Sequence, residues 1–171
     1  LAWHMLTRED FPGWLHMLNN GGTSIWEAWD GGGSRNHPTL GCIGVWLYQA
    51  PGGIRRDPST PAGKQIIIKP AILDGLTWVK CSNPSPHGKI ESNWQLKNGR
   101  LRLEITIPVN TTATVHLPTT EPGAVTESGR PATKAKGVTF LRTEKEASLY
   151  TVTSGTYIFE TPFNPATAAH R

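Results

Sequence analysis

Residues 89–109 read KIESNWQLKNGRLRLEITIPV, and this stretch decides the fold. Asn98-Gly99 is a dipeptide favoured in two-residue type I′ turns, so it predicts a β-hairpin. The turn sets a register in which mainly apolar residues face one another on one side. These pairs are Leu96 with Leu101, Trp94 with Leu103, Ser92 with Ile105 and Ile90 with Ile107. The other side carries Gln95 opposite Arg102 and Asn93 opposite Glu104, so one face is expected to be buried and the other solvated.

Short β-type runs continue on both sides of this hairpin. They lie at 64–70, 75–82, 112–118, 123–128, 137–141 and 148–159, the last expected as a strand pair turned at Ser154-Gly155. Many short strands separated by turns predict an antiparallel β-sandwich. The final eight residues, 164–171, are expected to fray.

The first 52 residues differ in composition, since they hold five of the seven tryptophans. From Asp10, the apolar residues follow the spacing of one helix face, with Asp10 as the N-cap and Gly21 as the stop. This face consists of Phe11, Trp14, Leu15 and Leu18. A second helix is predicted from Pro38 to Gln49, with Leu40, Ile43 and Leu47 on one face.

The predicted fold is therefore mostly β, with helices before a C-terminal antiparallel β-sandwich. We place the boundary between residues 1–52 and residues 53–171, where a stretch rich in Pro and Gly, 51–64, reads as a linker. About 50 residues of helix cannot form a core alone, so the helical part is expected to be incomplete.

Charge and composition narrow the class of partner. The net charge is +4 and the basic residues are scattered, which does not favour nucleic acid. No apolar run approaches the ~20 residues that would cross a membrane, and no signal peptide is visible, so we expect a soluble protein. The compartment stays open, with a lean to the cytoplasm. Cys42 and Cys81 are expected to be buried free thiols, without a disulfide or a metal site.

Residues 23–37, TSIWEAWDGGGSRNH, form the candidate site. Trp26 and Trp29 bracket Glu27, and three glycines would let the chain turn so that His37 folds back towards Glu27. Taken alone, a Trp-Glu-x-Trp stretch is more often a helix edge with core tryptophans and a solvated glutamate. Asp30 is interpreted as an Asx-turn or capping residue.

Three ordered segments resemble one family: GTSIWEAWDG (22–31), the stretch from SRNH to PGGI (34–54), and the stretch from GKQIIIKP to TVHLP (63–118). They are similar to the C-terminal end of bacterial α-L-rhamnosidases, and the similarity runs from about residue 8 to residue 161. This resemblance implies the end of an (α/α)₆ catalytic barrel followed by a C-terminal β-sandwich. The chain would then be a C-terminal fragment whose upstream barrel is missing.

The same resemblance assigns roles to residues. It implies that Glu27 is the general base of an inverting reaction, that His37 contacts the rhamnose, and that the general acid lies upstream. Trp26 and Trp29 would give flat apolar walls to the sugar. The expected partners are a rhamnose-containing glycoside and the upstream barrel, with no cofactor and no metal.

Two other functions are weighed for the sandwich. A carbohydrate-binding module would need a row of exposed aromatics, but the strand pattern points most aromatics inward, and Trp78 and Trp94 are expected in the core. A purely structural domain that supports the barrel is therefore favoured for the sandwich itself.

Overall fold

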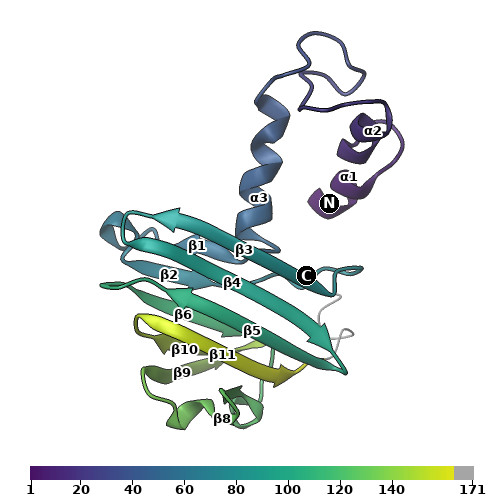
Figure 1. Ribbon diagram of the computed structural model, residues 1–171. Helices are drawn as coiled ribbons and strands as arrows, with labels where there is room; N and C mark the ends of the chain where they lie inside the picture. The colour runs from purple at the N-terminus through teal and green to yellow at the C-terminus, as the bar shows by residue number, and fades with distance from the viewer. Residues whose placement is uncertain (164–171) are drawn as a thin grey trace. The chain divides into compact units, whose positions relative to one another are not determined.

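The computed structural model describes residues 1–163, so the expected fraying of 164–171 lies outside the described residues. Contacts divide the chain into a unit Leu1–Leu47 and a second unit that begins at Tyr48. The first unit is helical and the second is built from two sheets (Figure 1).

The helices are α1 (Ala2–Thr7), α2 (Trp14–Asn19), the 3₁₀ turn η1 (Thr39–Cys42) and α3 (Ile43–Gln49), whose last two residues fall in the second unit. The second predicted helix is confirmed, with a 3₁₀ first turn after Pro38. The sequence pattern did not predict α1.

The predicted start of the other helix is wrong, because α2 begins at Trp14 and its N-cap is Gly13. Proline disfavours the helical region for the residue before it, so Pro12 keeps Phe11 out of the helix. Asp10 is bound instead by Arg8, whose Nε lies 2.5 Å from Oδ1. Phe11 is 55% exposed, so the predicted apolar face is not buried as a whole.

The second unit is a β-sandwich, as predicted. One sheet has the order β1 (Ile54–Arg56), β2 (Gln65–Ile68), β6 (Thr112–Leu117), β10 (Ala147–Val152), β9 (Val138–Glu144). The other has the order β3 (Trp78–Ser85), β4 (Gly88–Lys97), β5 (Arg100–Ile107), β11 (Gly155–Pro162), β7 (Thr126–Glu127), β8 (Arg130–Pro131). Short 3₁₀ turns lie at Pro61–Gly63, Pro122–Ala124 and Ala132–Lys134.

Two details of this sandwich differ from the prediction. The segment 51–64 is not only a linker, since it contains the edge strand β1. The pairing of β2 with β6 is parallel, whereas the other strand pairs are antiparallel. The chain leaves β2, builds β3 to β5 in the other sheet and then returns, and this long crossover permits a parallel pair.

The predicted hairpin is confirmed as β4 and β5. Trp94 pairs with Leu103 and Leu96 with Leu101, and Asn98 and Gly99 have φ of 51° and 68°, as a type I′ turn requires. Trp94 is 2% exposed, and its indole Nε1 donates a hydrogen bond of 2.8 Å to the carbonyl of Pro51. The core tryptophan therefore has a satisfied polar atom.

The expected hairpin at Ser154-Gly155 is wrong. β10 and β11 belong to different sheets, β10 pairing with β6 and β9 and β11 pairing with β5 and β7. A type I′ turn needs positive φ at both central residues, but only Gly155 has it, at 149°. Gly155 is instead the first residue of β11, so the chain has crossed to the second sheet by this position.

Two expectations of burial are also wrong. Trp78 is 58% exposed, because the alternation of β3 turns Val79 towards the core and Trp78 outward. Cys42 is exposed and Cys81 is half-buried, although both are free thiols as expected. Partial burial raises the pKa of the Cys81 thiol.

Two fully buried core serines generate a prediction. The Ser92 hydroxyl has no hydrogen-bond partner within residues 1–163, whereas Ser148 Oγ donates to the carbonyl of Thr119 at 2.9 Å. We expect Ser92→Ala to raise the free energy of unfolding by about 1 kcal/mol, since it removes an unpaired polar group. Ser148→Ala should lower it by about 1 kcal/mol.

Urea unfolding of the two variants at unchanged m-value measures both effects. Equal destabilisation by both substitutions would contradict the assignment of Ser92 as unpaired.

Candidate functional site

The candidate segment 23–37 is a loop that turns back on itself. The amide of Glu27 donates to the carbonyl of Ser34 at 2.8 Å, and the amide of His37 donates to the carbonyl of Ile25 at 2.8 Å. Ser24 Oγ adds a hydrogen bond to the carbonyl of Arg35. These hydrogen bonds place the backbone of His37 beside Ile25, two residues before Glu27 in the sequence.

The carboxylate of Glu27 is tied to the opposite side of this loop. Its Oε2 accepts the amide of Ser34 at 2.8 Å, while the residue remains exposed. One backbone donor thus holds one carboxylate oxygen, which leaves the other available to water or a ligand. Gly33 permits the contact, because a Cβ there would lie 2.6 Å from Oε2 and its φ is +70°.

Trp26 lies beneath this loop, where it is 4% exposed. The guanidinium carbon of Arg35 lies 5.1 Å from the Trp26 ring centroid, and the Trp26 amide lies 3.3 Å from Met17 Sδ. A Cβ on Gly31 would be 3.1 Å from the same ring. Trp26 is therefore a buried side chain that supports the loop. Arg35 covers the Trp26 ring through a cation–π contact.

Trp29 is half-buried and packs edge to face on Trp14, with ring centroids 4.7 Å apart. Trp14 in turn donates its indole N–H to the carbonyl of Leu40 at 3.1 Å. Asp30 Oδ1 accepts the amide of Gly32 at 2.9 Å, which is the expected Asx-turn. His37 is half-buried, and its Nδ1 lies 3.3 Å from the amide of Thr39.

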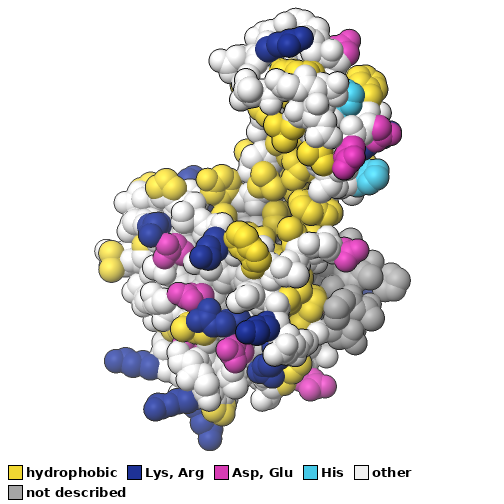
Figure 2. Space-filling model, turned by 45° about the vertical axis from the view of Figure 1, so that its right-hand side comes forward, with side chains coloured by type: hydrophobic (Ala, Val, Ile, Leu, Met, Phe, Trp, Pro, Cys, Tyr) yellow, Lys and Arg dark blue, Asp and Glu magenta, His cyan; other side chains and the backbone are white. Residues whose placement is uncertain are grey.

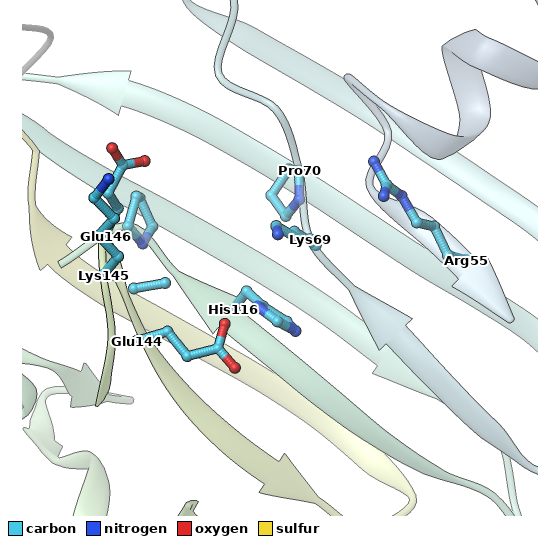
Figure 3. A pocket seen from close by; sticks show the side chains of 9 residues that line it. Arg55, Lys69, Pro70, His116, Glu144, Lys145 and Glu146 are labelled. Atoms are coloured by element: carbon cyan, nitrogen blue, oxygen red, sulfur yellow. The ribbon is translucent and has the colours of Figure 1, made fainter. Parts of the chain in front are cut away.

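A hollow that the sequence did not predict lies on the sandwich. It has a volume of about 440 Å³ and is lined by side chains from β1, β6, the end of β2 and the β9–β10 turn. Figure 3 shows the carboxylate of Glu144 near the His116 ring, with Arg55 farther away. The pKa of His116 is lowered because its ring is partly buried and Lys69 is positively charged.

Both signs of charge line this hollow, so it does not select an anion or a cation. Figure 2 likewise shows basic side chains scattered among acidic and uncharged ones.

Within residues 1–163, three or more His, Cys, Asp or Glu side chains nowhere gather closely enough to hold a metal ion. None of the described helices is both long and apolar enough to span a membrane.

Gly33 generates a test of the loop. Gly33→Ala should destabilise the Glu27–Ser34 contact, because it combines a left-handed backbone, about 1–2 kcal/mol for an L-residue, with a clash at Oε2. Gly21→Ala is the matched control, since Gly21 has φ +83° but nothing within 4 Å of its Cβ position. Amide hydrogen exchange at Ser34 should accelerate in the first variant and not in the second. Equal exchange at Ser34 in both would remove the predicted role of Gly33.

Two family models match the chain. Residues 1–50 match the bacterial α-L-rhamnosidase six-hairpin glycosidase domain, and residues 53–131 match the bacterial α-L-rhamnosidase C-terminal domain. An α-L-rhamnosidase of Formosa agariphila is 30% identical over 96% of this chain and 19% of its own length. One from Streptomyces avermitilis is 30% identical over 93% of this chain and 16% of its own length.

Solved structures agree with these matches. The crystal structure of Streptomyces avermitilis α-L-rhamnosidase complexed with L-rhamnose superposes with a TM-score of 0.81 at 29% identity, over 93% of this chain and 16% of that one. The α-L-rhamnosidase of Dictyoglumus thermophilum gives a TM-score of 0.81 at 27% identity, over 94% of this chain and 18% of that one. The chain thus spans less than a fifth of the length of these relatives.

The resemblance to this family is confirmed over residues 1–50 and 53–131. The relatives are glycoside hydrolases, and the fold of this chain follows theirs. This chain belongs to the bacterial α-L-rhamnosidase family and corresponds to a C-terminal part of its members.

Proposed function

We propose that this chain is part of an α-L-rhamnosidase that removes terminal α-L-rhamnose from rhamnosides, and that Glu27 is its general base. The observation that carries the proposal is the Glu27 carboxylate, which is exposed yet fixed by the Ser34 amide at 2.8 Å. It lies in the segment that matches the six-hairpin glycosidase domain.

The proposed reaction is inverting hydrolysis by two carboxyl groups. Glu27 takes a proton from a water molecule as that water attacks the anomeric carbon of the rhamnose. A carboxylic acid on the opposite side of the sugar protonates the leaving oxygen, and the two groups stand about 6.5–9.5 Å apart to leave room for the water. The hydrogen bond from Ser34 fixes Oε2, so Oε1 is the oxygen that accepts the proton.

The neighbouring residues would bind and orient the sugar. We propose that His37 contacts the rhamnose, since the loop brings it back beside Ile25. Trp29 offers a half-buried ring held by Trp14 as a wall for the sugar. Trp26 is covered by Arg35, so its contribution to that wall would be the support of the loop from beneath.

The general acid would come from the larger catalytic domain, as the family resemblance implies. We therefore expect the 171 residues alone to be inactive towards rhamnosides. For the sandwich we retain a structural role as its main function, because its aromatic side chains mostly fill the core.

The proposal is tested in a full-length enzyme. Glu27→Gln keeps the size of the side chain but cannot accept the proton, so kcat should fall by about 10²–10⁴ with little change in KM. His37→Ala should weaken binding as well as rate, because an orienting contact acts in both ground and transition states. Hydrolysis of an aryl α-L-rhamnoside measures both.

Asp30→Asn is the matched control, since its side chain caps Gly32 and should affect rate only mildly. Near-normal turnover by Glu27→Gln, or a collapse of activity with Asp30→Asn alone, would show that Glu27 is the wrong carboxylate.

A further inference from the structure

Trp78 is the one exposed aromatic side chain on the described strands. It is the first residue of β3, and its side chain is 58% exposed. Its direction is fixed by the register, because the neighbouring Val79 pairs with buried Trp94 on the inner face. The strand pairing therefore turns the large apolar surface of Trp78 outward, and this exposure does not come from fraying of β3.

The side chains around Trp78 are polar. On the outer face Trp78 is opposite Gln95, which is opposite Arg102, and the next row is Lys80, Asn93 and Glu104. Together these residues line a shallow hollow of about 550 Å³ on β3, β4 and β5. An indole thus stands beside amide, guanidinium and carboxylate groups on three adjacent strands.

Several of these polar groups are held in place. Arg102 Nη1 lies 3.0 Å from Glu104 Oε2, which orients the guanidinium along the sheet. The backbone amide of Cys81 donates to Asn93 Oδ1 at 3.1 Å, so that Asn93 retains its NH₂ group as a donor. The hollow therefore offers preset donors and acceptors next to a flat apolar ring.

This combination suits a sugar better than a protein partner. A pyranose has an apolar C–H face that packs on an indole, and hydroxyl groups that both donate and accept. The core of a protein interface is depleted in charged residues, whereas Lys80, Arg102 and Glu104 border Trp78 here. Their mixed charge also favours a neutral ligand over an acidic one.

We propose that the outer face of β3, β4 and β5 is a carbohydrate-binding site in which Trp78 stacks on a pyranose ring of a neutral, rhamnose-containing oligosaccharide. The choice of a rhamnose-containing sugar rests on the proposed function, whereas the site itself rests on Trp78 and its neighbours. The site lies on the sandwich and involves neither Glu27 nor His37.

The test is a titration of the ¹⁵N-labelled 171-residue chain with an α-L-rhamnosyl-rhamnose disaccharide, followed by NMR. Saturable shifts are expected for the Trp78 indole N–H and the side-chain amides of Asn93 and Gln95. Trp78→Ala should raise the dissociation constant by about tenfold or more. Trp78→Phe should raise it by less, because a smaller ring remains. Leu141→Ala, an exposed apolar residue of the other sheet, should change nothing.

Shifts that avoid Trp78, or unchanged affinity in Trp78→Ala, would overturn the proposal. So would the absence of saturation at tens of millimolar disaccharide. Because Glu27→Gln leaves this face intact, its kinetics report on the proposed function separately.

Discussion

The pairing of Trp94 with Leu103 across β4 and β5 is the constraint on which the sandwich depends. Both side chains are buried, at 2% and 0% exposure, and the Asn98-Gly99 turn admits only this register. A slip of one residue between the two strands would turn one of these side chains to the outside, so the hydrophobic effect and the turn geometry enforce the same arrangement. On the other side of β4, Val79 of β3 pairs with Trp94, and this second register turns Trp78 outward.

The sequence predicted those parts of the fold that depend on local pattern. The hairpin follows from a turn dipeptide and period-two alternation, and the helix at 38–49 follows from apolar spacing. Long-range choices could not be predicted in this way. The crossing from β10 to β11 depends on which sheet offers an edge, and the late start of α2 depends on Arg8 binding Asp10 and on Pro12. The size and apolar character of Trp78 favour a core position, but the alternation along β3 turns it outward.

The sequence named the residues of the candidate site but did not reveal their contacts with one another. The stretch 23–37 indicated a turn at the glycines, and the family resemblance singled out Glu27 and His37. The contact from Ser34 to Glu27 and the cover of Arg35 over Trp26 depend on the path of an irregular loop. Such a loop has no periodicity that a pattern could detect. In the proposed enzyme this loop would hold the base, and the sandwich would act mainly as a support.

The most direct test of Glu27 as the general base is a crystal structure of a full-length enzyme that contains this chain, with L-rhamnose bound. We expect Glu27 Oε1 to lie about 2.6–3.2 Å from a water or hydroxyl at the anomeric carbon, with the Ser34 amide still bound to Oε2. A different carboxylate in that position, with Glu27 turned away from the sugar, would contradict it.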